Sequence, residues 1–176
     1  MSTDTAVKTQ VPADPRTLRL ARLVLLIVAI IEVVGSLTSL VILFDSDPSV
    51  PGTSPGGLVI TATILLAPPV AIAALALAIS GPLGATIISI ALLGLLDWVS
   101  FVPSVANFWH EFPGSGFGGA HSIVQTIVLP LLGIAAIVLA WRGERLGLAA
   151  TFAILPTLLN FLGVVAFAIG VAIYGF

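Results

Sequence analysis

Charged residues are too scarce in this chain to cover the surface of a water-soluble domain. The 176 residues include 6 Lys and Arg and 8 Asp and Glu, so that 8% are charged and 59% are hydrophobic. Soluble domains carry roughly 25% charged residues. The scarcity excludes a soluble globular domain, a disordered chain and a nucleic-acid-binding protein. The absence of cysteine excludes disulfide scaffolds, thiol redox centres and thiolate metal sites. We therefore expect most of the chain to lie in lipid.

Five apolar stretches are long enough to cross a bilayer as helices, since a hydrocarbon core of about 30 Å takes about 20 helical residues. They lack the strand-like alternation that a lipid-facing barrel needs. The predicted fold is therefore all-α, an integral membrane bundle of five transmembrane helices in one domain, 23–176. The polar segment 1–22 is predicted to be cytoplasmic and disordered, and the first span to be an uncleaved signal anchor. The predicted spans are 23–44, 58–79, 85–105, 123–141 and 148–174.

The basic residues predict the orientation of these spans. Four of them precede the first span and two lie between the fourth and fifth, so five crossings bring all six to one side. Because basic residues concentrate on the cytoplasmic side, the N-terminus is predicted inside and the C-terminus outside. Short loops and richness in Ala, Gly, Val and Leu favour the plasma (inner) membrane of a bacterium. The six residues are Lys8, Arg16, Arg19, Arg22, Arg142 and Arg145.

The weakest of the five spans is the second, because Pro68 and Pro69 stand at its centre and remove two backbone donors. A re-entrant pair of half-helices would explain the prolines equally well. It would also move Arg142 and Arg145 to the outer side, against the charge rule. A full crossing with a kink is therefore predicted.

Three polar residues fall near the bilayer centre. Glu32 lies 10 positions into its predicted span, and Asp97 and Asn160 each lie 13 positions into theirs. Helical spacing places Ser36 and Ser39 on the face of Glu32, Ser100 on that of Asp97, and Pro156 on that of Asn160. Small and polar residues favour contact between membrane helices. We therefore expect the first, third and fifth spans to face one another around a polar core, flanked by the second and fourth.

The two midplane carboxyls have no basic side chain to pair with, because no Lys, Arg or His lies inside any predicted span. Their role can be interpreted in two ways. Each carboxyl is protonated and hydrogen-bonded, ionised in a hydrated cavity, or ionised beside a bound cation. In one interpretation Glu32 and Asp97 hold helices together, bonded to each other, to Asn160 or to serine hydroxyls. In the other they form a proton or cation site, as intramembrane ionisable groups often do.

The outer loop after the third span contains the only imidazoles. His110, Glu111 and His121 would suit zinc or copper. The spacing of the two histidines matches no metal signature, and the surrounding aromatics are typical of an interfacial belt. Gly114, Gly116 and Gly119 match the dinucleotide-binding fingerprint by letter but follow no strand, so no nucleotide is predicted.

No matched nucleophile and base are recognisable, so the chain is predicted not to be an enzyme and to need no cofactor. A non-enzymatic accessory, scaffold or assembly subunit of a membrane complex is predicted. The alternative is a small proton- or cation-coupled transporter or channel that uses Glu32 and Asp97. The expected partners are the lipid bilayer and other membrane subunits or further copies of the chain, with no nucleic acid.

Overall fold

The computed structural model describes residues 15–44, 52–107 and 122–175, and every regular element in these ranges is helical. Five helices are long and apolar enough to cross a membrane, which confirms the predicted all-α bundle with five candidate spans. The first helix begins eight residues earlier than the predicted span, because Pro15 is well suited to the first turn of a helix. Within the segment 1–22 that is predicted to be disordered, residues 15–22 are instead helical and belong to α1, and residues 1–14 lie outside the described ranges. The elements are α1 (Pro15–Leu40), η1 (Val41–Phe44), α2 (Pro55–Ser80), α3 (Leu83–Asn107), η3 (Val124–Val128), α5 (Leu129–Trp141) and α6 (Leu146–Tyr174).

The second span is one continuous helix, as a full crossing requires. α2 runs through Pro68 and Pro69 without interruption. Its first turn is capped by Ser54, whose hydroxyl accepts a hydrogen bond from the backbone N–H of Gly57 at 3.1 Å. The re-entrant alternative is therefore not what the chain adopts.

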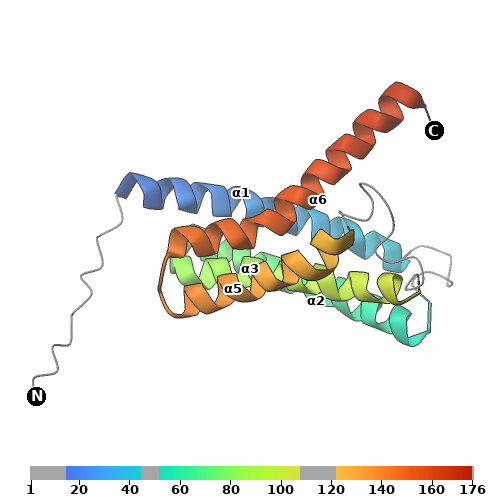
Figure 1. Ribbon diagram of the computed structural model, residues 1–176, viewed down its shortest axis with the longest axis horizontal. Helices are drawn as coiled ribbons and strands as arrows, with labels where there is room; N and C mark the ends of the chain where they lie inside the picture. The colour runs from blue at the N-terminus through green and yellow to red at the C-terminus, as the bar shows by residue number, and fades with distance from the viewer. Residues whose placement is uncertain (1–14, 45–51, 108–121, 176) are drawn as a thin grey trace, which may run out of the picture.

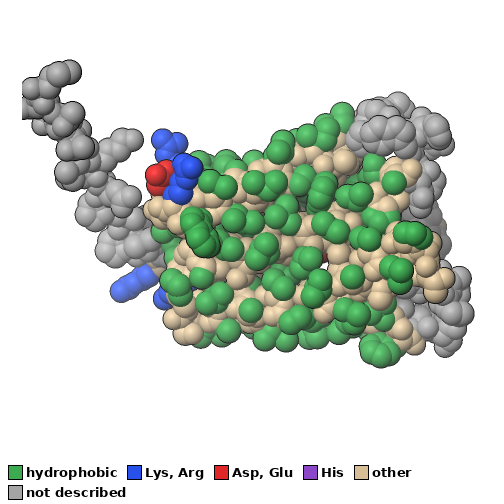
Figure 2. All heavy atoms as spheres, turned by 90° about the horizontal axis from the view of Figure 1, so that it is seen from below, with side chains coloured by type: hydrophobic (Ala, Val, Ile, Leu, Met, Phe, Trp, Pro, Cys, Tyr) green, Lys and Arg blue, Asp and Glu red, His purple; other side chains and the backbone are tan. Residues whose placement is uncertain are grey.

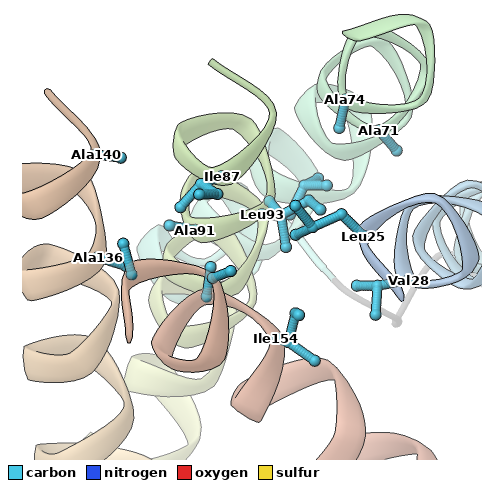
Figure 3. Close-up of a cluster of buried hydrophobic side chains, with 14 residues drawn as sticks. Leu25, Val28, Ala71, Ala74, Ile87, Ala91, Leu93, Ala136, Ala140 and Ile154 are labelled. Atoms are coloured by element: carbon cyan, nitrogen blue, oxygen red, sulfur yellow. The ribbon is translucent and has the colours of Figure 1, made fainter. Parts of the chain in front are cut away.

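The core of the bundle surrounds α3, which packs against α1, α2, α5 and α6. α1, α3 and α6 also contact one another in pairs, as the polar residues of their sequences predict. Figure 3 shows Leu25 of α1 directed towards Leu93 of α3, while α2 and α5 contribute mainly alanines to the buried cluster. Alanine lets membrane helices approach closely. The resulting van der Waals packing holds the helices together, because no hydrophobic driving force acts between helices in lipid.

Two short turns, one between α2 and α3 and one between α5 and α6, lie at the same end of the bundle as the start of α1 (Figure 1). The Arg22 guanidinium donates to the carbonyl of Gly81, between α2 and α3, at 2.6 Å. Gly143, with φ of +66°, and Arg145, with φ of +46°, form the turn between α5 and α6. Figure 2 shows the Lys and Arg side chains gathered at this end and hydrophobic side chains over the rest of the visible face. The described arginines therefore share one end, while the cytoplasmic location of that end stays a prediction.

The second half of α6 leaves the bundle. Figure 1 shows it projecting away from the other helices towards the C-terminus. Pro156 and Thr157 are buried, whereas every residue from Leu158 to Val165 is exposed. Proline removes the backbone donor that the carbonyl of Phe152 would receive, and it favours a change of helix direction. In a single copy of the chain, the residues from Leu158 to Val165 are thus the least covered part of α6 among those described.

Candidate functional site: a polar cavity at mid-depth

A cavity of about 640 Å³ lies where α1, α2, α3 and α6 meet. Glu32 and Asp97 lie 14 and 15 residues into candidate spans of 22 and 21 residues, so both lie at a similar distance along their helices, inside the candidate spans. All six polar residues singled out from the sequence line this cavity, together with two threonines that were not. The polar lining residues are Glu32, Ser36, Ser39, Thr63, Asp97, Ser100, Thr157 and Asn160.

The Glu32 carboxyl accepts a hydrogen bond from the hydroxyl of Thr157. Thr157 is buried, with 5% of its surface exposed, and Glu32 is half-buried. The interhelical partner of Glu32 is therefore a threonine on α6, rather than Asp97, Asn160 or a serine. Thr157 stands three positions before Asn160 on the same helix. This spacing was the available signal for its inclusion in the polar core.

The hydroxyls of the other lining residues bond within their own helices. Ser36 donates to the carbonyl of Val33 and Ser39 to that of Gly35, at 3.1 and 3.0 Å. Ser100 donates to the carbonyl of Asp97 at 2.7 Å. Their protons are thus used locally, and their oxygens remain available as acceptors. The expectation that these serines bond the carboxyls across helices is not met, and the cavity is rich in acceptors.

A second cavity, of about 370 Å³, adjoins the first on the side of η3 and α5. Asp97, Ser100 and Asn160 line both cavities. Its wall includes Trp98, whose indole N–H donates to the carbonyl of Thr126 at 3.0 Å. Asp97 therefore stands between two hollows, one towards α1 and one towards η3.

The larger cavity opens on the side of the bundle. Its mouth is flanked by Val34 of α1 and Val164 of α6, which are 60% and 66% exposed. Asp97 and Asn160 are themselves exposed, and no side-chain hydrogen bond joins either of them to another described residue. Two polar groups within candidate membrane spans are thus left accessible in a single copy.

The predicted metal ligands His110, Glu111 and His121 lie outside the described residues, so the loop site stays a prediction. Within the described ranges, no group of three or more His, Asp or Glu side chains comes close enough to hold a metal ion. The chemistry that the cavity offers is binding: two carboxyls and several hydroxyl oxygens accept hydrogen bonds or attract a cation.

Comparison of the chain with protein-family models, with curated proteins and with solved structures gives no match.

Proposed function

We propose that this chain is a non-enzymatic subunit of a membrane complex, acting as an accessory, scaffold or assembly factor. The observation that carries the proposal is the exposure of Asp97 and Asn160 on the side of a single copy. A carboxyl at the bilayer centre costs roughly 2.5–3.5 kcal/mol on insertion scales. A neighbouring helix that covers the cavity mouth removes these groups from lipid and offers them partners.

The second half of α6 supports the same role. It leaves the bundle after Thr157, and its residues from Leu158 to Val165 are all exposed. Lipid solvates such a helix adequately, so its apolar surface alone demands no partner. Its combination with the exposed amide of Asn160 is what favours a protein neighbour on this side. We place the complex in the plasma membrane of a bacterium, with the N-terminus in the cytoplasm.

Extraction from native membranes in a mild detergent, followed by native mass measurement, tests the proposal. A second polypeptide in fixed stoichiometry is expected. Asp97→Asn together with Asn160→Leu should reduce its recovery, whereas Ser80→Ala, at the exposed end of α2, should not. Recovery of a monomer or of a pure homo-oligomer in several mild detergents would contradict the proposal.

A proton- or cation-coupled transporter or channel is the second candidate. It is favoured by one observation, namely that Glu32 and Asp97 share a cavity. Purified protein in liposomes should then move protons or alkali cations, and Glu32→Gln with Asp97→Asn should abolish the movement. Flux no greater than that of empty liposomes, under several gradients, rules this candidate out.

A further inference from the structure

The side opening of the larger cavity presents carboxyls without a counter-charge. Glu32 and Asp97 line it from α1 and α3, and Asn160 adds an amide from α6. The six basic residues of the chain stand at positions 8, 16, 19, 22, 142 and 145, so none lies in the candidate spans beyond Arg22. The Arg22 guanidinium is engaged at the end of the bundle, where it donates to the carbonyl of Gly81.

A second copy of this chain cannot supply the missing charge. Its candidate spans carry the same residues, so two copies facing each other would bring four carboxyls together without any basic side chain. Like charges at short range in a medium of low dielectric repel strongly. An occupant that supplies a counter-charge to ionised carboxyls at this opening therefore differs from the chain itself.

The residues on both sides of the opening indicate what kind of surface its occupant has. Ile30 and Val34 of α1 stand on one side, and Phe161 and Val164 of α6 on the other, all of them apolar and exposed. A groove with apolar walls and an acidic floor, open along the side of a bundle, matches an apolar helix with one basic residue. Basic and acidic residues within membranes commonly pair with each other, since each alone is costly.

We propose that the groove between α1 and the second half of α6 binds a transmembrane helix of another protein, which carries a Lys or Arg at mid-depth opposite Glu32 and Asp97. This inference rests on the proposed role as a subunit and names the chemistry of the partner. The partner's basic side chain enters the cavity, takes the carboxyls as its counter-charge, and donates hydrogen bonds from its ammonium or guanidinium group to their oxygens.

Synthetic transmembrane helices test this in liposomes that contain the full-length protein. Three helices of about 22 Leu and Ala residues are identical except for the central residue. That residue is Lys in the first helix, Gln in the second and Leu in the third. Fluorescence transfer reports binding, with a donor on the helix and an acceptor on Thr53→Cys, which introduces the single thiol of the chain. The Lys helix is expected to bind about tenfold more tightly than the Leu helix, a difference readily measured.

Variants of the protein assign the effect to the carboxyls. Glu32→Gln with Asp97→Asn should abolish the preference for the Lys helix, so that the Lys and Leu helices bind equally. Glu144→Gln, at an exposed turn, should leave the preference unchanged. Circular dichroism and retained binding of the Leu helix show that the double variant is folded. If it does not fold, Asp97→Asn alone should still lower the preference severalfold, because no hydrogen bond of its side chain joins it to another described residue.

Three results would overturn the inference. They are equal binding of all three helices, binding of the Gln helix as tight as that of the Lys helix, and a Lys preference that survives in the double variant. Self-association that is lost with the carboxyls, without any binding of the Lys helix, would assign the groove to a second copy and overturn it too. The two proposals can fail separately. If a native partner is found but has no basic residue in its spans, and the three probe helices bind equally, this inference is wrong and the subunit role stands. If the Lys helix binds specifically but no native partner is found, the subunit role is wrong and this inference stands.

Discussion

The hydroxyl of Thr157 on α6 donates a hydrogen bond to the carboxyl of Glu32 on α1, across 125 residues of sequence. This bond lies where α6 changes its surroundings, since Thr157 is buried and Leu158 is exposed. It therefore ties the last packed turn of α6 to the first helix, and it holds one wall of the polar cavity in place.

Replacement of Thr157 by Val removes this hydrogen bond and keeps the shape of the side chain. Interhelical hydrogen bonds in one membrane protein average about 0.6 kcal/mol and reach about 1.7 kcal/mol. Because Thr157→Val also leaves the half-buried Glu32 without its partner, we expect a loss in the upper part of this range. Unfolding by sodium dodecyl sulfate in mixed micelles measures it. Thr157→Ser should retain most of the stability, and so should Thr151→Val, which changes an exposed threonine bonded within its own helix. Equal stability of Thr157→Val and the unaltered protein would contradict this assignment.

Trp98 and Pro130 form a second relationship that a double-mutant cycle can test. Pro130 has no N–H, so it cannot donate to the carbonyl of Thr126 four residues earlier. The Trp98 indole donates to that carbonyl instead, at 3.0 Å. Trp98→Phe should therefore destabilise the protein by about 1 kcal/mol. Pro130→Ala restores a backbone donor, so Trp98→Phe should cost less in that background. Additive effects of the two substitutions would show that the indole bond does not compensate for the proline.

The contact between α3 and α6 predicts the effect of a single methyl group. A Cβ added at Gly94 would stand 3.3 Å from the ring of Pro156, which cannot turn aside as a flexible side chain would. Gly94→Ala should therefore destabilise the bundle by about 1–3 kcal/mol, as overpacking does. Gly163→Ala is the matched control on α6, because no atom lies within 4 Å of its Cβ position. It should be neutral or slightly stabilising in the same unfolding assay. A stable Gly94→Ala protein would show that the two helices can separate at this point at little cost.

The spans could be predicted from sequence because length and apolar composition suffice for a helix that crosses lipid. The lining of the cavity was also accessible, since Glu32, Ser36, Ser39, Asp97, Ser100 and Asn160 are polar residues in apolar surroundings, and helical spacing groups them. Thr157 and Thr63 were missed because a threonine in a helix commonly bonds its own backbone, as Thr63 does to Ile60. Only the packing of α6 against α1 distinguishes Thr157 from Thr63.

The departure of α6 from the bundle could not be predicted in the same way. Apolar residues occur on every side of this helix in both halves, so no periodicity separates the packed half from the projecting half. Lipid and protein interior are similarly apolar, which removes the pattern that marks a buried face in water. Pro156 was visible, but a proline alone does not state which way a helix turns. The lateral mouth of the cavity follows from that turn and was therefore inaccessible to sequence reasoning.

The orientation of the bundle can be tested with single cysteines, because the chain has none of its own. Glu144, in the turn between α5 and α6, and Thr53, just before α2, are both exposed and lie at opposite ends of spans. The positive-inside rule predicts that the Arg142–Arg145 turn faces the cytoplasm. In intact cells, a membrane-impermeant maleimide should therefore label Thr53→Cys, and it should label Glu144→Cys only after the membrane is permeabilised. Labelling of Glu144→Cys in intact cells, with Thr53→Cys protected, would reverse the predicted orientation, placing the N-terminus outside.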